Sequence, residues 1–413
     1  MPFRVSNPEK QEIPHYKSER VHLLLEPGTA FSQSSEPVII PFEYVHHIII
    51  TAQVNGKRGD LLYDPVRNIL LDRQYANDRN ISLIDGGEAG YGGRVTTGGA
   101  GGNRHEVLFA RNISLVINQL SYRYPLTPVI PIDSIMATSL GRHVDGLLGI
   151  NVFSDYILQF DFPGERFILH PSSTFNAPDG AVELPIAWVE NRPTVTLTIQ
   201  TGDIESEAVF LLDFGMGGTL RFTTGYTDRQ QLPEKLQPNV ASGNEHGLGG
   251  ALESLVARLP RLKIGDIRLD SLVVTMAREK EGRDAYPKWD GLVGLGLMSR
   301  FTVYLDITGN RIWFQPNKRF DRPSEYITTG LSFEPQDFKK QLVVSGVKEG
   351  SNADEAGFRP GDIIYTVAGE LASDLNVREW KEALEARVGA LIPVGVQRDD
   401  KKICLNLRIS SSL

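Results

Sequence analysis

The feature of this sequence that most constrains its fold is an internal repeat. Residues 145–170 (DGLLGINVFSDYILQFDFPGERFILH) align without a gap with residues 290–315 (DGLVGLGLMSRFTVYLDITGNRIWFQ), and eight positions are identical. Upstream, residues 40–45 (IPFEYV) match residues 184–189 (LPIAWV) at nearly the same offset. A duplication of this length, with its landmarks in the same order, predicts two similar units packed about a pseudo-two-fold axis.

The chain between these landmarks is predicted to be mainly β. Short runs rich in Val, Ile and Leu recur between turn signals, and 40 Gly and 24 Pro punctuate the sequence. Both repeats end in a hairpin, with Phe-Pro-Gly-Glu and Ile-Thr-Gly-Asn as the turns. The clearest predicted strands are Ile48–Val54, Phe109–Ile117, Tyr156–Phe162, Val195–Ile199, Leu272–Met276 and Thr302–Ile307.

The composition shifts after about residue 322, and the remaining residues suffice for an independent domain. This last part contains the best helical pattern of the chain, at Val377–Val388, and a final predicted strand at Ile403–Ile409. We therefore expect four parts: an N-terminal extension (1–35, with one strand at His22–Leu25), two lobes (36–180 and 181–322) and a C-terminal domain (323–413).

The composition excludes several classes of function. Hydrophobic residues make up 41% and charged residues 23% of the chain, and the net charge is −8. An acidic chain without a Lys/Arg run argues against nucleic acid as a partner. No apolar run reaches 18 residues, so no membrane span is expected, and the polar residues 1–20 show no signal peptide. A single cysteine, Cys404, excludes an internal disulfide and a Cys-cluster zinc site.

Each repeat also carries a strand-like segment that ends in aspartate. Residues 61–64 read LLYD and residues 210–213 read FLLD, and each aspartate precedes a glycine-rich stretch and then the Asp-Gly-Leu-x-Gly element. Because Asp64 and Asp213 occupy equivalent positions, the duplication predicts a pair of carboxylates where the two lobes meet. The alternative is that each aspartate only caps a turn.

Paired carboxylates have a specific chemistry. Two carboxylates about 3 Å apart cannot both ionise, so they share one proton. One of them then acts as a base on a water molecule, while the protonated one polarises a carbonyl group. Asp64 and Asp213 are therefore the candidate catalytic residues. No metal-ligand motif or cofactor-binding motif accompanies them, so no metal and no cofactor is expected.

The second aspartate lies in a segment that resembles a known family. Residues 210–218 (FLLDFGMGG) resemble the Leu-Leu-Asp-Thr-Gly active-site strand of aspartic peptidases of the pepsin/retropepsin superfamily. Residues 145–150 (DGLLGI) and 290–295 (DGLVGL) resemble the apolar-apolar-Gly element of the same family. The resemblance implies two pseudo-symmetric aspartic-peptidase-like β-barrel lobes that bind extended polypeptide in a cleft between them. Members of this group are often periplasmic or secreted in bacteria.

The sequence departs from the family pattern of Asp, then Thr or Ser, then Gly. The first lobe has Asp64-Pro65-Val66, and the second has Asp213-Phe214-Gly215. In the family, the hydroxyls bond to the backbone of the opposite loop and hold the two carboxylates together. Neither Pro65 nor Phe214 supplies a hydroxyl. Two functions therefore stay open: an aspartic endopeptidase, and a catalytically impaired pseudopeptidase that binds peptides.

Two glycine-rich stretches are candidates for substrate-covering flaps. Gly86–Gly102 holds nine glycines, and Gly243–Gly250 is its counterpart in the second lobe. By resemblance, Tyr91 and Gly92 in the first stretch and Gly249 in the second would contact substrate, together with Gly215. The alternative is that both stretches are surface loops.

The C-terminal part resembles a bacterial PDZ domain. Residues 356–362 (AGFRPGD) predict a short helix stopped by Gly357 and a turn into a strand at Ile363–Val367. The resemblance implies that a carboxylate-binding loop receives a C-terminal peptide, which adds as a strand beside the Val377–Val388 helix. The loop comprises Gly330, Leu331, Ser332 and Phe333. The alternative is a PDZ fold that packs within the chain and binds no ligand.

Overall fold

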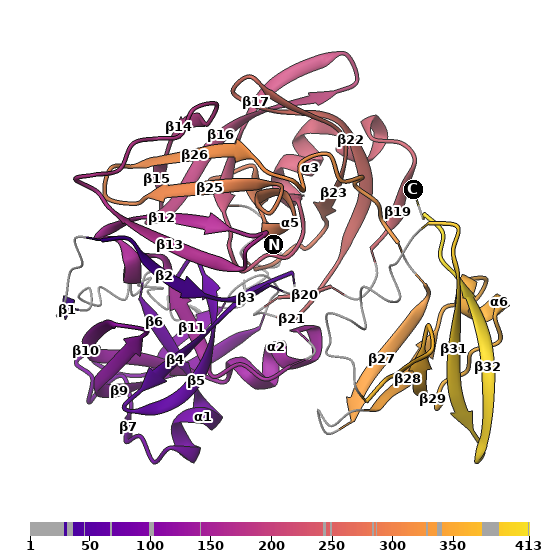
Figure 1. Cartoon of the computed structure of the whole chain (residues 1–413), viewed down its shortest axis with the longest axis horizontal. Helices are drawn as coiled ribbons and strands as arrows, with labels where there is room; N and C mark the ends of the chain where they lie inside the picture. The colour runs from indigo at the N-terminus through magenta and orange to yellow at the C-terminus, as the bar shows by residue number, and fades with distance from the viewer. Residues whose placement is uncertain are drawn as a thin grey trace, which may run out of the picture.

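The computed structural model has a mainly β fold, and its described residues form five hydrogen-bonded sheets (Figure 1). It describes residues 29–30, 36–44, 46–66, 68–98, 103–140, 142–242, 245–247, 250–282, 285, 287–327, 329–336, 341–373, 388–411 and 413. The predicted strand at His22–Leu25 and, apart from Val388, the predicted helix at Val377–Val388 lie outside these residues. The six predicted strand segments fall on β4, β9, β12, β16, β23 and β25.

The first repeat forms a closed barrel of six strands, here called the first barrel. Its strands follow one another around the ring in the order β10–β6–β11–β5–β4–β9, and β9 pairs with β10 to close it. The strands are β4 (Ile48–Val54), β5 (Lys57–Asp64), β6 (Ile69–Asp72), β9 (Arg104–Ile117), β10 (Leu120–Ile130) and β11 (Gly146–Gly149). Around them lie β1 (Thr29–Ala30), β3 (Glu43–Tyr44), β7 (Leu83–Ile84), β8 (Val95–Gly98), α1 (Arg73–Asp78), α2 (Ile132–Leu140) and a 3-10 turn at Ile150–Phe153.

The second repeat forms a second barrel with the same strand order. Its ring runs β23–β18–β24–β17–β16–β22 and closes between β16 and β22. Its strands are β16 (Arg192–Thr201), β17 (Ile204–Leu212), β18 (Leu220–Phe222), β22 (Ser254–Ile264), β23 (Ile267–Ala277) and β24 (Gly291–Val293). Around them lie β15 (Ala187–Val189), β19 (Asn239–Ala241), β20 (Glu245–Gly247), β21 (Gly250–Leu252), α3 (Thr224–Gln230), α4 (Leu232–Lys235) and α5 (Leu295–Met298).

A six-stranded sheet joins the two repeats, and it follows the order β14–β26–β25–β12–β13–β2 (Figure 1). At its centre β12 pairs antiparallel with β25, and Gln159 lies opposite Tyr304, its own equivalent in the repeat. The pairing is therefore two-fold symmetric about this residue pair. The six strands are β2 (Val38–Pro41), β12 (Tyr156–Asp161), β13 (Arg166–Pro171), β14 (Val182–Pro185), β25 (Phe301–Asp306) and β26 (Arg311–Pro316).

The identical residues of the repeat make identical hydrogen bonds. Asp161 accepts from the Gly164 N–H (3.0 Å) and from Arg166 (2.8 Å) within the β12–β13 hairpin. The equivalent β25–β26 hairpin repeats this set, with Asp306 accepting from the Gly309 N–H at 2.6 Å and from Arg311 at 2.9 Å. Similarly, Oδ2 of Asp145 accepts from the Asp60 N–H, and Oδ2 of Asp290 accepts from the Val209 N–H. The duplicated residues are thus those that fix the hairpins and the barrel strands.

The two barrels and the joining sheet share one apolar core. A single cluster of buried side chains extends from Val38 in the first repeat to Phe314 in the second. Burial of this size is the main favourable contribution to folding. Because the cluster does not separate at the repeat boundary, the two barrels are expected to unfold together.

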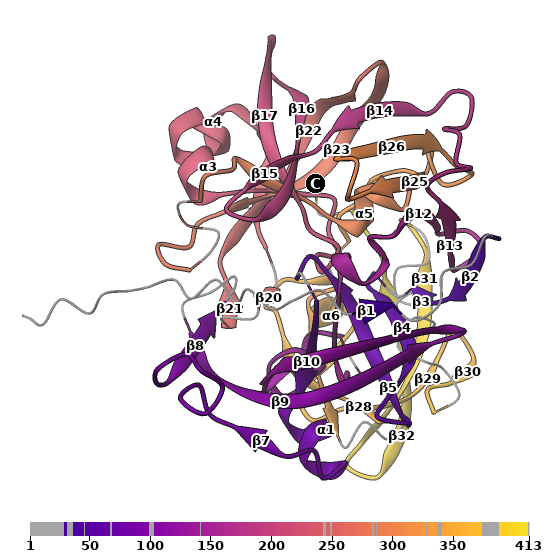
Figure 2. The ribbon, with the colours of Figure 1, turned by 90° about the vertical axis from the view of Figure 1, so that its left-hand side faces the viewer.

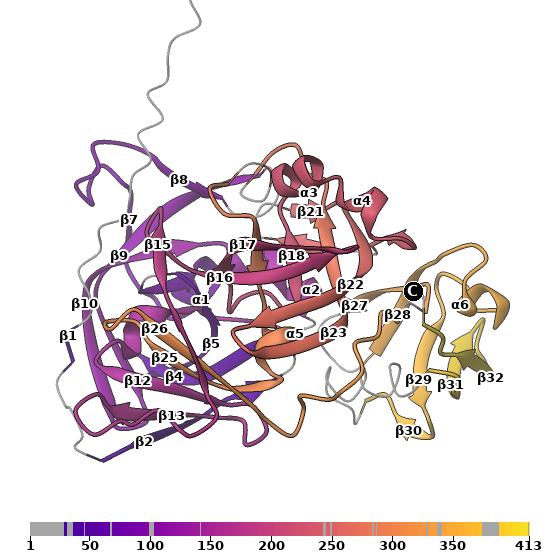
Figure 3. The same ribbon diagram turned by 90° about the horizontal axis from the view of Figure 1, so that it is seen from above.

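The C-terminal unit is a separate sheet in the order β27–β28–β29–β31–β32, with β30 paired to β29. Its core is its own and includes Val344, Phe358 and Leu407. Figure 3 shows the unit to one side of the barrels. Its elements are β27 (Leu331–Gln336), β28 (Gln341–Val347), α6 (Asn352–Glu355), β29 (Ile363–Val367), β30 (Glu370–Leu371), β31 (Leu391–Arg398) and β32 (Lys401–Arg408).

The connecting segment is bonded to both sides. Ser324 and Glu325 accept hydrogen bonds from Arg258 of the second barrel, at 2.6 and 2.8 Å. Glu325 also accepts from the Ser411 hydroxyl at 2.9 Å, beside a β-bridge between Ile327 and Ser411. One carboxylate therefore links the second barrel to the end of the C-terminal unit. None of the helices among the described residues combines the length and the apolar character that crossing a bilayer requires.

His170 makes the joining sheet sensitive to acid. Its Nε2 lies 2.7 Å from Gln159 Oε1, and burial lowers the pKa of the imidazole below its ordinary value of 6.5. The unfolded chain then binds more protons than the folded chain between the two pKa values. The contribution of His170 to the free energy of unfolding is therefore fully present above pH 6.5. It is lost as the pH falls from 6.5 through the pKa of the folded state.

The variant His170→Gln tests this, since Gln315 occupies the equivalent position in the second repeat. We expect the variant to lose the part of the acid sensitivity that His170 causes, because glutamine does not titrate. Urea unfolding at about pH 7.5 and about pH 5 measures the effect. The same pH dependence in the variant and the wild type would contradict the assignment.

Candidate functional site

The barrel strands deliver the two predicted aspartates to equivalent positions. Asp64 is the last residue of β5, which pairs in parallel with β11, and Gly149 lies opposite it. Asp213 directly follows β17, which pairs in parallel with β24. In each barrel the Asp-Gly-Leu-x-Gly element therefore lies beside the strand that carries the aspartate. Both aspartates emerge at the same end of that strand pair.

The two aspartates also form the same turn. Oδ1 of Asp64 accepts a hydrogen bond from the Val66 N–H at 3.2 Å, and Oδ1 of Asp213 accepts from the Gly215 N–H at 3.0 Å. Val66 is thus the structural equivalent of Gly215, and Pro65 is the equivalent of Phe214. The same Asx-type turn therefore orients both carboxylates.

Gly215 lies between the two carboxylates. A Cβ atom built on Gly215 would overlap Oδ2 of Asp64 and would lie 3.3 Å from Oδ1 of Asp213. Both carboxylates therefore border the same backbone position, where only glycine leaves space. Asp213 is buried and only 4% exposed, whereas Asp64 is partly exposed. The structure thus brings Asp64, Asp213 and Gly215 together.

Residues of both repeats pack closely against the loop after Asp213. A Cβ on Gly217 would lie 3.0 Å from the His46 carbonyl oxygen, and a Cβ on Gly294 would overlap the Gly218 carbonyl oxygen. The His46 segment therefore packs from the first repeat onto the loop of the second. His46 was not among the predicted site residues. The match of residues 40–45 with 184–189 makes Glu190 its repeat equivalent, and both residues adopt a positive φ, 58° and 50°.

The first glycine-rich stretch divides into two structures. Residues 85–94 form a loop between β7 and β8, in which the Tyr91 N–H donates to the Gly86 carbonyl at 2.7 Å. The Tyr91 ring stacks on Phe109 with centroids 5.0 Å apart, and its burial raises the pKa of the phenol. Gly92 follows in this loop at φ 74°. Tyr91 is thus packed against the first barrel, and no described contact joins Tyr91 or Gly92 to the aspartates.

Residues 95–98 of the first stretch form β8, which lies near the counterpart hairpin of the second repeat. β8 pairs with the start of β9, and β20 pairs with β21. A Cβ on Gly250 would lie 2.9 Å from Nδ2 of Asn103, so β21 lies against the β9 end of the first hairpin (Figure 2). The helix α2 of the first repeat also contacts β20. Gly249, predicted to contact substrate, lies outside the described residues.

The predicted carboxylate-binding loop is partly a strand. Leu331, Ser332 and Phe333 begin β27 and pair with β28, because the sheet register continues to Leu331 with a shift between Ser332 and Phe333. The loop itself is Thr329 and Gly330. Among the described residues β27 pairs only with β28, so its other edge has no strand partner in that part of the chain. An edge strand without a partner can accept a further strand.

Backbone contacts fix the loop before β27. Gly330 has a φ of 81°, its carbonyl accepts from the Lys348 N–H at 2.9 Å, and a Cβ there would overlap Ser351. The Thr329 hydroxyl accepts from the Leu331 N–H at 3.3 Å. Gly330 is therefore required both for its φ and for the close approach of Ser351.

The AGFRPGD segment (residues 356–362) ends α6 and anchors the following turn to β31. As predicted, α6 ends before Gly357, which has a φ of 86° and whose N–H donates to the Asp354 carbonyl. Asp362 is buried and accepts from Arg398 at 2.7 Å on both carboxylate oxygens. The carboxylate of Asp362 in turn raises the pKa of the Arg398 guanidinium. This bidentate pair joins the turn to β31.

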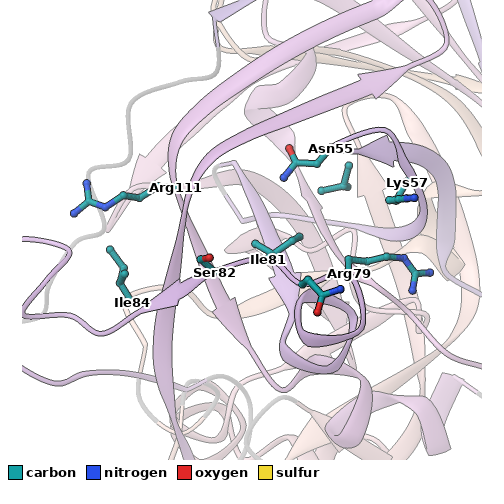
Figure 4. Close-up of a pocket in the computed structure, with 9 residues that line it drawn as sticks. Asn55, Lys57, Arg79, Ile81, Ser82, Ile84 and Arg111 are labelled. Atoms are coloured by element: carbon teal, nitrogen blue, oxygen red, sulfur yellow. The ribbon is translucent and has the colours of Figure 1, made fainter.

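A hollow of about 330 Å³ lies on the first barrel, away from the aspartates (Figure 4). Three cations line it, but the Arg111 side chain points away from the end where Lys57 and Arg79 lie. Their charged groups therefore do not converge on one ligand position. No group of three His, Cys, Asp or Glu suited to a metal ion occurs in the part of the chain that the structure describes.

Comparison with known proteins identifies the C-terminal unit. Its elements form a small sheet domain with a glycine-containing loop, a short helix and the buried Asp362–Arg398 pair. Residues 343–398 match the PDZ domain family. The chain therefore contains a PDZ domain near its C-terminus, and this domain class binds peptides. No curated protein matches the chain.

The position of Gly215 gives a direct test of the carboxylate geometry. In Gly215→Ala the new Cβ overlaps the Asp64 carboxylate, so the two aspartates must move apart, and overpacking of this kind costs about 1–3 kcal/mol. Gly218→Ala is the matched control, because its Cβ would meet only Met216 Cε, at 4.0 Å. Thermal unfolding of both variants measures the difference. Equal destabilisation by the two would contradict the geometry.

The loop of the PDZ domain has its own test. Gly330→Ala combines an unfavourable φ with overlap on Ser351, and we expect it to lose peptide binding and about 2 kcal/mol of stability. Gly350→Ala shares a positive φ, 69°, but has open space around its Cβ, so it measures backbone strain alone. Fluorescence titration with a C-terminal peptide library reports binding. Peptide affinity that is unchanged in Gly330→Ala would show that the loop plays no part.

Proposed function

We propose that the two barrels bind an extended polypeptide over Asp64 and Asp213 and hydrolyse its peptide bonds as an aspartic endopeptidase. The observation that carries the proposal is the shared border of both carboxylates at Gly215, reached from two equivalent turns. In this reading residues 36–180 and 181–322 are two aspartic-peptidase-like lobes. Residues 323–413 form the PDZ part.

The paired carboxylates supply both the acid and the base for hydrolysis. The ionised carboxylate takes a proton from a water molecule, whose oxygen attacks the peptide carbonyl carbon, while the protonated carboxylate donates to the carbonyl oxygen. The intermediate carries two hydroxyl groups on the former carbonyl carbon. Its C–N bond then breaks as the proton taken from water passes to the leaving nitrogen, while the other carboxylate takes back a proton from one hydroxyl, which becomes the C=O of the new carboxyl group. The pair therefore ends the cycle with one shared proton, as it began.

In this proposal, two neighbouring hairpins, one from each repeat, lie over the bound substrate. Hairpin β8–β9 comes from the first repeat and β20–β21 from the second, and their contact at Asn103 and Gly250 supports a role on either side of one polypeptide. Gly249 lies between β20 and β21 in the sequence, and we propose that its backbone contacts the substrate. Tyr91 and Gly92 belong to the β7–β8 loop. In this proposal, the stacking of Tyr91 on Phe109 holds that loop in place, and the loop in turn positions the β8–β9 hairpin over the substrate.

The PDZ domain provides a second peptide site. A C-terminal peptide would extend the sheet at the open edge of β27, with its carboxylate at the backbone N–H groups of Leu331, Ser332 and Phe333. Such a site would hold one end of a polypeptide while the barrels act on another part of it. Two linked sites raise the effective concentration of the substrate at the barrels.

A second function is favoured by Pro65 and Phe214. Neither side chain carries a hydroxyl, so the hydrogen bonds that join the two active-site loops in aspartic peptidases do not form in the usual way. A misplacement of about 1 Å can cost on the order of a hundredfold in rate. The alternative is therefore a pseudopeptidase that binds polypeptide at the barrels and at the PDZ domain without cleaving it.

Cleavage of a denatured protein between pH 3 and 8 separates the two functions. The endopeptidase proposal predicts cleavage by the wild type and a loss of at least about a hundredfold in Asp213→Asn, which removes one carboxylate of the pair. Asp203→Asn, in the exposed turn between β16 and β17, is the matched control and is expected to retain activity. Equal cleavage by wild type and Asp213→Asn would end the proposal. Binding of the same protein without cleavage would establish the alternative.

A further inference from the structure

The positions that lack hydroxyls are occupied by buried apolar side chains. Pro65 and Phe214 are equivalent residues of the two turns, and both are buried. Phe214 is fully buried, at 0% exposure. A ring of this size directly after Asp213 must be accommodated by its neighbours, so its contacts show what takes the place of the missing hydrogen bonds.

Both ring partners of Phe214 come from the other repeat. The ring stacks on Phe160, with centroids 5.1 Å apart and an interplanar angle of 8°. It also meets Tyr63 edge to face, with centroids 5.4 Å apart, and Tyr63 meets Phe160 at 5.8 Å. Tyr63, Phe160 and Phe214 are here called the aromatic cluster. Stacked and edge-to-face arrangements at these distances are the favourable ones for aromatic rings.

The aromatic cluster has no copy on the other side of the pseudo-two-fold axis. The repeat equivalents of Tyr63 and Phe160 are Leu212 and Leu305, and the equivalent of Phe214 is Pro65. The large rings of the first repeat therefore receive one ring from the second repeat, while the symmetric position holds smaller side chains. The duplication has thus diverged at the positions that contact each other across the two barrels.

The cluster is attached directly to both aspartates. Tyr63 precedes Asp64, Phe214 follows Asp213, and Phe160 lies in β12 next to the pseudo-two-fold axis, opposite Val303. Contact between the Tyr63 and Phe214 rings therefore limits how far the two strand ends can separate. The contact is made by the rings, because the buried Tyr63 hydroxyl has no hydrogen-bond partner among the described residues.

We infer that the aromatic cluster performs the task that hydroxyl hydrogen bonds perform in aspartic peptidases: it joins the two active-site turns and sets Asp213 against Asp64. Phe214 is then a positioning residue rather than a catalytic one. Its catalytic consequence rests on the proposed function, but the mechanical coupling of the two barrels does not. In aspartic peptidases the contact between the two loops is polar and symmetric, whereas the aromatic cluster is apolar and lies on one side of the pseudo-two-fold axis. Ring contacts need no hydrogen-bond donor, so they can form although Pro65 has no backbone N–H.

A double-mutant cycle on thermal unfolding tests the coupling. Phe214→Leu and Tyr63→Leu are each expected to lower the Tm by on the order of 5 °C, and the double variant is expected to lose clearly less than the sum. Tyr63→Phe is expected to retain the wild-type Tm, since it keeps the ring. Additive losses for Phe214→Leu and Tyr63→Leu, or a large loss in Tyr63→Phe, would overturn the inference.

Phe222 provides the matched control. It is also fully buried, but it stacks on Tyr226 of its own repeat, with centroids 5.6 Å apart. Phe222→Leu combined with Tyr63→Leu is expected to give additive losses. If Phe214→Leu does not fold, Phe214→Met, which keeps more of the apolar volume, enters the same cycle. Coupling of equal size in the Phe222 cycle would also overturn the inference, because it would show no specific contact.

Kinetics separate positioning from general stability. Well below the Tm, Phe214→Leu is expected to reduce kcat at least about tenfold with KM unchanged, whereas Phe222→Leu keeps both. An unchanged kcat in Phe214→Leu would overturn the positioning role. If the wild type does not cleave polypeptide, the proposed function fails, and the double-mutant cycle still decides whether the rings couple the barrels.

Discussion

The pairing of β12 with β25 is the interaction on which the rest of the structure depends. Its register places Gln159 opposite Tyr304, its own equivalent, so the local two-fold symmetry of the chain is set within one pair of strands. A shift by one residue would turn every side chain of the strand to the opposite face and would break the shared apolar core. Because the barrels extend from this sheet, the same register places Asp64 and Asp213 at one common position.

The two-fold symmetry holds for the hydrogen bonds of the barrels and hairpins, but it does not hold for the residues next to the two aspartates. The repeated hydrogen bonds of Asp161 and Asp306, and of Asp145 and Asp290, keep the two halves alike. At the site, the two repeats share the aspartates but differ in the residues that follow them. The protein therefore combines two symmetric barrels with an aromatic cluster that has no symmetric copy. The PDZ domain adds a separate core, and it belongs to a domain class that binds peptides.

Much of the fold could be predicted because the information is local or repeated. Alternation and turn residues predicted the strands, and the order of landmarks predicted the symmetry. What the sequence could not show depends on contacts between distant residues. Tyr91 stacks on Phe109, since the loop before β8 folds back on the barrel, and its contact with substrate stays a prediction. Leu331–Phe333 was expected to be a loop but begins β27, because pairing with β28 extends further than the turn signals show. No sequence pattern shows which ring Phe214 meets.

A high-resolution crystal structure that resolves the water around Asp64 and Asp213 would show directly whether the two carboxylates form a pair. We expect both carboxylates to lie within hydrogen-bond distance of one shared water molecule next to Gly215, with the ring of Phe214 stacked on Phe160. Carboxylates that point apart, each with a separate hydration shell, would contradict this expectation.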